Sequence, residues 1–300
     1  MNIEEFKFKD RLIKGITEDG HFRVAVVKTT DVVKEAQQRH GLSLLGTVIL
    51  GKALTATMLL AAELKKEERI QLRLDGNGPL VHVTAEANSL GEIRGYVGNP
   101  TAELDYTKPG VSIGDGLGLG VLTFTKVLYN EAEPRTSTIQ LVDGDVNSDV
   151  AHYLVQSEQI PSAVILDVGI SETGELTHAG GMLLQTLPGA PEGQIDMLQE
   201  RLASFPPIDQ LLENGQYIDE IMTKVISPIK VKELARKPVD FYCRCSRDRF
   251  LDALAMLSFD DLKDLEGETQ EISCHYCNNR EKISKEEIAQ LIADAQAKLN

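Results

Sequence analysis

The four cysteines of this sequence lie close to its C-terminal end and fall into two tight pairs. Residues 1–242 contain none; Cys243 and Cys245 then form a C-x-C pair, and Cys274 and Cys277 form a C-x-x-C pair. In a reducing compartment, thiols clustered in this way are typical of a metal site or a redox centre rather than a disulfide framework. Four thiolates can occupy the corners of a tetrahedron around one Zn²⁺ at about 2.3 Å, although their softness also suits an iron–sulfur centre. We therefore predict one Zn²⁺ per chain, held by all four sulfurs, with no open position for a substrate.

Other side chains near the sulfurs could modify this chemistry. His275 lies inside the C-x-x-C pair, but four thiolates already complete a tetrahedron, and so we expect it not to be a ligand. The arginines close to the sulfurs in sequence are Arg244, Arg247, Arg249 and Arg280. Cations near a thiol lower its pKa, so we expect this cluster to be the most oxidisable feature of the chain. A thioredoxin-like motif is the other interpretation of C-x-x-C, but it requires a surrounding βαβ domain and only 23 residues follow it here.

The charge of the chain limits its partners. The sequence has 31 Lys and Arg against 46 Asp and Glu, a formal net charge of −15. Binding to nucleic acid depends largely on neutralising phosphates, and binding to anionic membranes depends on basic clusters. The last 60 residues hold 8 basic and 12 acidic side chains, unlike a basic nucleic-acid-binding finger. We predict no nucleic acid and no membrane as partner; a zinc-ribbon nucleic-acid-binding protein is the alternative interpretation.

Two segments bear on location. Residues 1–7 lack the apolar run of a signal peptide, which predicts a cytoplasmic protein. Residues 42–64 are long and apolar enough to span a bilayer, but Lys52 near their centre would cost about 2.5–3.5 kcal/mol on insertion. We predict instead a helix buried inside a domain. Within it, the run from Gly46 to Lys52 nearly matches a phosphate-binding loop, but Ala53 supplies no hydroxyl for Mg²⁺ and no strand precedes it.

The hydrophobic pattern predicts an α+β fold in three parts. Residues 1–188 form a core domain in which sheet packs against a central helix. Residues 189–240 form a helical linker of short amphipathic helices, and residues 241–300 form a small zinc-binding redox-switch domain. The strands expected in the core are 11–16, 22–27, 69–75, 80–87, 92–98, two or more within 117–141, 163–169 and 182–187. The helices expected along the chain are 31–40, 43–65, 149–159, 195–204, 208–212, 218–226, 248–257, 260–265 and 284–299.

The sequence resembles the 33 kDa chaperonin family, the redox-regulated heat-shock holdases, over essentially its whole length. The resemblance begins with the cysteine pattern and extends to motifs spread over residues 50–185. These motifs are Leu50-Gly51-Lys52-Ala53-Leu54-Thr55-Ala56, Asp75-Gly76-Asn77-Gly78-Pro79-Leu80, Ile93-Arg94-Gly95-Tyr96-Val97-Gly98-Asn99-Pro100, Ser157-Glu158-Gln159-Ile160-Pro161-Ser162 and Ala179-Gly180-Gly181-Met182-Leu183-Leu184-Gln185.

The resemblance implies both a site and a function. By the family pattern, the four cysteines are the zinc ligands, and the oxidised form contains the disulfides Cys243–Cys245 and Cys274–Cys277. Spacing alone leaves all three connectivities open. The implied function is that of an ATP-independent holdase, inactive when reduced and zinc-bound and active when oxidised with zinc released. Its partners would be unfolded or oxidatively damaged client proteins, and its active form a homodimer.

An enzyme in the first domain with a zinc appendage is a further alternative. Such an enzyme would need a persistent pocket with convergent titratable groups. The scattered histidines of this chain, and the segment Ser157-Glu158-Gln159, do not by their spacing form a catalytic arrangement. We therefore predict that the protein is not an enzyme.

Overall fold

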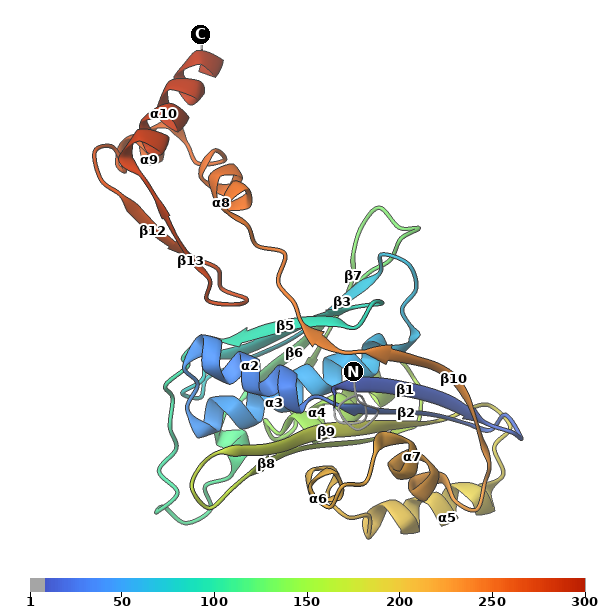
Figure 1. Ribbon diagram of the computed structural model, residues 1–300. Helices are drawn as coiled ribbons and strands as arrows, with labels where there is room; N and C mark the ends of the chain where they lie inside the picture. The colour runs from blue at the N-terminus through green and yellow to red at the C-terminus, as the bar shows by residue number, and fades with distance from the viewer. Residues whose placement is uncertain (1–8, 300) are drawn as a thin grey trace. The chain divides into compact units, whose positions relative to one another are not determined.

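The computed structural model describes residues 9–299, and the chain divides into two compact units after Tyr242. The segment 1–8, on which the expectation about a signal peptide depends, lies outside the described residues. The first unit contains two sheets with helices between and beside them, and the second is a small unit that begins at Cys243 (Figure 1). The mixture of sheets and helices confirms the predicted α+β class.

The first sheet of the larger unit has five strands among the described residues, in the order β10-β1-β2-β9-β8. Its neighbouring strands are antiparallel throughout. The expected hairpin is confirmed, with its turn at residues 18–21. The strands are β1 (Arg11–Thr17), β2 (Phe22–Lys28), β8 (Ser162–Ile170), β9 (Leu176–Thr186) and β10 (Val231–Pro238).

The second sheet has the order β11-β5-β4-β3-β6-β7 within residues 9–299. Its strands alternate buried and exposed side chains, as expected for a sheet with one face on the core. Only β11 is parallel to its neighbour. The strands are β3 (Arg69–Gly76), β4 (His82–Asn88), β5 (Glu92–Val97), β6 (Gly120–Val127), β7 (Arg135–Gln140) and β11 (Asp240–Phe241).

The helix α3 (Leu44–Leu60) lies between the two sheets and contacts strands of both. Ser43 caps its first turn by accepting from the Gly46 amide. The segment Leu44–Glu63 is long and apolar enough to cross a membrane, but 78% of its most apolar window is buried inside the unit. The prediction of a buried core helix is confirmed, and Lys52 is accommodated by an ion pair with Asp145 at 2.7 Å. The shorter helices around this core are α2 (Thr30–His40), α4 (Val146–Gln156), η1 (Ala61–Glu63) and η2 (Ile113–Gly116).

The expected linker helices pack on the other face of the first sheet (Figure 1). They are α5 (Glu192–Ala203), α6 (Ile208–Glu213) and α7 (Ile218–Ile226). Alternation along β2 and β9 explains this arrangement, since Val24 and Met182 face the linker helices whereas Ala25 and Leu183 face the core around α3. The linker helices therefore belong to the same compact unit as both sheets.

Residues 231–241 differ from the expected helical linker. They form β10, which pairs along β1, and β11, which pairs with β5. The pairing of β10 shifts register between Lys14 and Gly15, where a Cβ on Gly15 would lie 2.4 Å from Val231 Cγ1. The strand escaped prediction because its residues are mostly exposed at the edge of the sheet and show no apolar alternation.

The second unit consists of α8 (Arg247–Leu254), α9 (Phe259–Lys263), the hairpin β12 (Gln270–Ser273) and β13 (Arg280–Ile283), and α10 (Lys285–Leu299). The hairpin was not predicted, because its strands have only four residues each. Five buried apolar side chains form the core of this unit among the described residues. They are Leu254, Leu262, Ile283, Ile288 and Ile292.

Candidate metal centre

Two local structures place the cysteines. Cys274 and Cys277 lie in the turn that joins β12 to β13, where Ser273 pairs with Arg280. The turn is held by two backbone hydrogen bonds, from the Cys274 amide to Asn279 and from the Asn278 amide to the Cys274 carbonyl. Cys243 and Cys245 precede α8, whose first turn is capped by the Ser246 hydroxyl. A hairpin turn and a helix start, about 30 residues apart in sequence, thus present the two pairs.

The four sulfurs form one cluster. All lie within 4.8 Å of one another. Two of the separations join the two motifs, with 3.7 Å between the Sγ atoms of Cys243 and Cys274 and 3.3 Å between those of Cys245 and Cys277. A tetrahedron with metal–sulfur bonds of about 2.3 Å has sulfur–sulfur edges of about 3.8 Å. The arrangement therefore fits a single tetrahedral ion, whereas a multi-iron cluster would spread the sulfurs farther apart.

Burial makes these thiols costly to ionise without a metal. Cys277 is buried, and the other three are partly exposed. Burial raises the pKa of the Cys277 thiol far above its ordinary value, although the Asn279 amide hydrogen bond acts in the opposite direction. Burial likewise raises the pKa of Cys245. A cation among the sulfurs would reverse this preference, because coordination stabilises thiolates.

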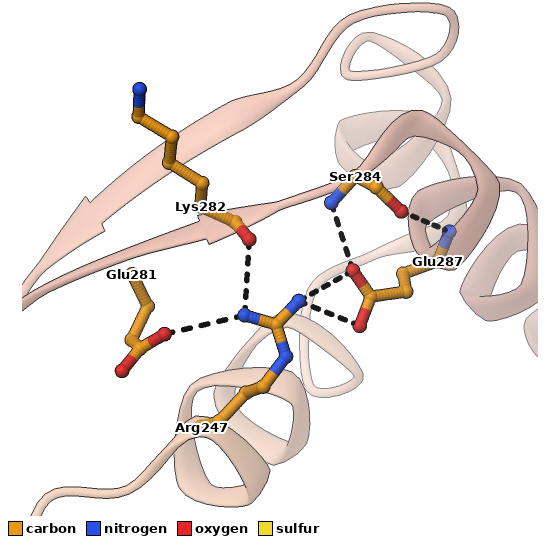
Figure 2. A network of polar contacts seen from close by, with 5 residues as sticks. All are labelled: Arg247, Glu281, Lys282, Ser284 and Glu287. Atoms are coloured by element: carbon orange, nitrogen blue, oxygen red, sulfur yellow. Dashed lines mark hydrogen bonds and ion pairs between the residues drawn. The ribbon is translucent and has the colours of Figure 1, made fainter.

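Arg247 connects the start of α8 to the hairpin and to α10 (Figure 2). Its Nη2 donates to both carboxylate oxygens of Glu287, at 2.8 and 2.7 Å. Its Nη1 donates to Glu281 at 3.2 Å and to the Lys282 carbonyl at 3.0 Å. Glu287 also accepts from the Ser284 amide at 2.9 Å, and its own amide donates to the Ser284 hydroxyl. We call this five-residue network, made of Arg247, Glu281, Lys282, Ser284 and Glu287, the arginine clamp.

The clamp corrects part of the expectation about the arginines. Arg247 and Arg280 form ion pairs with glutamates. Arg247 binds Glu281 and Glu287 in the arginine clamp, and Arg280 binds Glu271 at 3.1 Å. The expectation that neighbouring cations lower the thiol pKa is wrong for Cys245 and Cys277 in the metal-free site, since burial dominates there. His275 is not a member of the sulfur cluster within the described residues, and its exclusion as a ligand stays a prediction.

Sequence reasoning missed the clamp, although one signal was present. Ser284 and Glu287 form the pattern S-x-x-E before an apolar periodic segment, which is the signature of a capping box at a helix start. That signal locates Glu287 in the first turn of α10. It does not reveal that Arg247 binds the same carboxylate, because 40 residues separate the two in sequence.

Comparison with known proteins identifies the family. The family model described as Hsp33 protein matches residues 10–284. A 33 kDa chaperonin of Desulforamulus reducens is 36% identical over 293 residues, which cover 97% of this chain and 99% of the relative. A 33 kDa chaperonin of Carboxydothermus hydrogenoformans is 40% identical over 282 residues, which cover 93% and 96%.

A solved structure agrees. The crystal structure of a 33 kDa chaperonin from Thermotoga maritima, described as a heat shock protein 33 homolog, superimposes with a TM-score of 0.89 at 30% identity. The match covers 96% of this chain and 99% of that one. Sequence and structure thus agree over nearly the full length, and the chain belongs to the Hsp33 family.

Proposed function

We propose that this protein is a redox-regulated, ATP-independent chaperone that binds unfolding proteins and prevents their aggregation under oxidative stress. Membership of the Hsp33 family and the name 33 kDa chaperonin carried by its relatives support a chaperone role. The observation that carries the redox part is the cluster of four sulfurs within 4.8 Å in a unit with a very small apolar core. ATP independence is supported by α3, which buries the only near match to a phosphate-binding loop that we identify in the sequence.

In the reduced protein, we propose that Cys243, Cys245, Cys274 and Cys277 hold one Zn²⁺. When bound, the ion would hold the four sulfurs as thiolates and cross-link the start of α8 to the β12–β13 turn. Structural zinc contributes about 10–16 kcal/mol in small metal-folded peptides, whereas whole domains are stable by about 5–15 kcal/mol. A unit whose core cluster holds only five buried apolar side chains among its described residues is therefore expected to depend on its metal.

Oxidation would convert the four thiolates into the disulfides Cys243–Cys245 and Cys274–Cys277. Forming each disulfide removes two electrons from a pair of thiolates. Two equivalents of a two-electron oxidant such as hydrogen peroxide are therefore needed, and with two protons each they are reduced to water. All four cysteines are free in the present arrangement, and a disulfide requires a sulfur–sulfur distance of about 2.05 Å. Forming the bonds within each motif thus requires the cysteines to leave their present arrangement. The disulfides would close very short loops and prevent metal rebinding without restoring the fold.

Client binding would follow from loss of order in the second unit and then in the linker helices. The side chains of α7 that face the first sheet include Ile218, Ile221 and Val225, all fully buried. Short helices of this kind depend on packing, so their release would expose a continuous apolar surface on both the helices and the sheet. We propose that this surface binds unfolded or oxidatively damaged clients, that the active form is a homodimer and that the protein acts in the cytoplasm without nucleic acid or membrane partners.

The test measures zinc, thiols and chaperone activity on the same samples. The reduced chain should contain about one zinc per chain, four free thiols and little activity against light scattering by an aggregating client. After peroxide it should contain no zinc and no free thiols, and should suppress scattering. Cys277→Ser should lose zinc when reduced, whereas the matched variant His275→Ala should retain it under mild chelation. Zinc retained by Cys277→Ser, or activity unchanged by oxidation, would contradict the proposal.

A further inference from the structure

A cavity of about 230 Å³ lies in the first unit, away from the cysteines. It is lined by the end of α3 with η1, by α4, and by strands of both sheets. Its apolar wall includes Leu59, Phe124 and Leu183, which are almost fully buried. An engineered apolar cavity of about 150 Å³ is sufficient for benzene, so this one has room for a ligand of roughly ten non-hydrogen atoms.

Part of the cavity wall is built by the motif at residues 157–162. The proposed chaperone function does not use this motif. The Glu158 carboxylate accepts hydrogen bonds from Lys126 Nζ, at 2.8 Å to each oxygen, and from the Tyr153 hydroxyl at 2.7 Å. The next residue, Gln159, has a φ of 55°, in the left-handed region that non-glycine residues rarely adopt. This backbone conformation turns both Glu158 and Ile160 into the wall.

Glu158, Lys126 and Tyr153 hydrogen-bond to one another and are not arranged for proton transfer. Burial opposes ionisation of Glu158, but the hydrogen bonds from Lys126 and Tyr153 outweigh it and lower the pKa of the carboxyl. Burial and the neighbouring carboxylate raise the pKa of the Tyr153 phenol. Glu158 is therefore ionised and Tyr153 neutral across the physiological range. A general acid or base would need a pKa near the working pH, so the cavity is suited to binding rather than catalysis.

A second cation that lines the cavity, Arg23, is less tightly bound to a carboxylate than Lys126 is. Arg23 lies at the rim with a side chain 34% exposed, and the closest approach of its ion pair with Glu63 is 3.8 Å, beyond hydrogen-bond distance. Glu63 approaches Lys14 more closely, at 3.2 Å. Glu63 is thus shared between Arg23, which lines the cavity, and Lys14, which does not, whereas the other charged lining residues, Lys126 and Glu158, bind each other directly. A guanidinium in this position can bind a carboxylate through two parallel hydrogen bonds.

We propose that this cavity binds a small amphipathic monocarboxylate, such as a medium-chain fatty acid or an arylalkanoic acid. The carboxylate pairs with Arg23, and the hydrocarbon body lies between Leu59, Phe124 and Leu183. The single negative charge of the ligand pairs with Arg23, whose own partner Glu63 lies 3.8 Å away and is shared with Lys14. The apolar wall has the size of a body of eight to ten carbon atoms, estimated roughly from the volume per atom of the benzene cavity. Because its walls are sheet and core helix, the site is largely formed before the ligand arrives.

The first test is calorimetric titration of the full reduced chain with octanoate. We expect saturable binding of one octanoate per chain, and affinity weaker by at least about tenfold for Arg23→Gln, which removes the charge-assisted hydrogen bonds. Arg135→Gln, the same change at an exposed arginine outside the cavity, should bind as the wild type does. Equal binding of 1-octanol, equal binding by Arg23→Gln, or no saturable binding would each overturn the proposal.

A second measurement locates the ligand without relying on the arginine variant. Nuclear Overhauser effects should connect the octanoate methylene protons to the ring of Phe124 in the wild-type chain. Ala62→Leu, which fills the cavity from η1, should abolish them while circular dichroism stays unchanged. Contacts only with aromatic residues outside the cavity, that is, with neither Phe124 nor Tyr153, would overturn the assignment. Since every measurement uses the reduced chain, the result is independent of whether oxidation activates a chaperone.

Discussion

Arg247 is the side chain that ties the C-x-C pair to the rest of its unit. It follows Cys245 by two positions and binds Glu287 through both carboxylate oxygens. Glu287 in turn closes the first turn of α10 through Ser284. One partly exposed network therefore fixes three elements around the four cysteines. Its contribution is to their positions, because exposed ion pairs add little to stability unless several charges act together.

We predict that Arg247→Gln accelerates zinc release. Glutamine can replace neither the paired hydrogen bonds to Glu287 nor the charge opposite Glu281, so the start of α8 should separate from the hairpin more often. The rate of zinc transfer to a chromogenic chelator should rise by roughly fivefold. Arg280→Gln is the matched control, since Arg280 is 63% exposed and pairs with Glu271 outside the clamp. Equal rates of zinc release in the two variants would show that the arginine clamp does not slow zinc release.

Asp149 gives the first unit a pH-dependent contribution to stability. Its side chain is fully buried, one oxygen accepts from the Val142 amide at 2.6 Å, and the other has no hydrogen-bond partner among the described residues. Burial raises the pKa of this carboxyl from 3.8 to about 6. Between these values the folded state binds the proton more tightly than the unfolded state, so the stability that Asp149 contributes is present at low pH and is lost as the pH rises toward 6 and above.

We therefore predict that Asp149→Asn gains stability relative to the wild type as the pH increases. The amide oxygen can still accept from Val142, but no buried charge develops. The unfolding free energy of the variant minus that of the wild type should rise by about 2 kcal/mol between pH 4 and pH 7. Urea unfolding of the first unit, followed by circular dichroism across this range, measures the difference. A difference that does not change with pH would show that burial does not raise the pKa of Asp149 above its value in the unfolded chain.

At the residue scale, cysteine spacing was sufficient to predict the sulfur cluster, because two close pairs of thiols are typical of one tetrahedral metal site. The same reasoning could not find Arg247–Glu287, which depends on how α8, the hairpin and α10 pack. Nor could it find the cavity around Glu158, because Arg23, Lys126 and Tyr153 come from three separate elements. A local sequence pattern predicts the chemistry of residues that are close in sequence. A site assembled from distant segments can be recognised only when the packing of those segments is known.

At the element scale, the sequence of the linker helices explains most directly how they could take part in the proposed function. The apolar residues of α7 recur at Ile218, Ile221 and Val225, which is the period of a helix with one buried face. The helix has nine residues, too few to be stable alone in water. Its order therefore depends on the apolar contacts with β2 and with the other linker helices.

We predict that Ile221→Ala weakens the packing of the linker helices and makes the reduced protein partly active. Removing a buried isoleucine typically costs 2–5 kcal/mol, roughly the free energy needed to release a short packed element. Reduced Ile221→Ala should suppress light scattering by an aggregating client without oxidant. Lys224→Ala, on the exposed side of the same helix, is the control and should stay inactive. If neither variant is active when reduced, the surface under α7 does not bind clients.

The strand β10 shows why the element pattern was only partly predictable. Apolar periodicity located α3, α7 and the strands of the hairpin at residues 11–28, because these elements bury one face or more. Residues 231–238 bury little and are held by backbone pairing to β1, which apolar patterning does not reveal. Position in the sheet, and not side-chain type, makes this segment a strand.

At the scale of the whole molecule, stability is distributed unequally. The first unit buries a large core around α3 and a second cluster under the linker helices, whereas the second unit buries few apolar side chains within the described residues. Residues 231–241 pair with both sheets and lead directly to Cys243. Disorder that begins in the second unit would therefore reach the edge strands β11 and β10 and then the linker helices through the chain itself, before it affects the inner strands of the sheets.

We predict that oxidation lowers amide-exchange protection in a graded order along the chain. The second unit, residues 243–300, should lose nearly all protection when zinc leaves, because its apolar core is too small to hold it without metal. Residues 190–240 should lose protection partly, since the free energy needed to release α5, α6 and α7 is lower than the free energy of unfolding the whole first unit. Residues 11–188 should stay mostly protected, because their hydrogen bonds lie in two sheets around a buried helix.

Hydrogen exchange measured by mass spectrometry on reduced, oxidised and re-reduced samples tests this order. Re-reduction with zinc should restore the original pattern, since exposed disulfides of short loops are readily reduced. A sample in which all four cysteines are replaced by serine separates metal loss from disulfide formation: it should exchange like the oxidised chain in residues 243–300 even without oxidant. Full protection of those residues in an oxidised, zinc-free chain would mean that the second unit folds without its metal. The sulfur cluster could then not act as the switch, and a chaperone that is active in both redox states would be the better account.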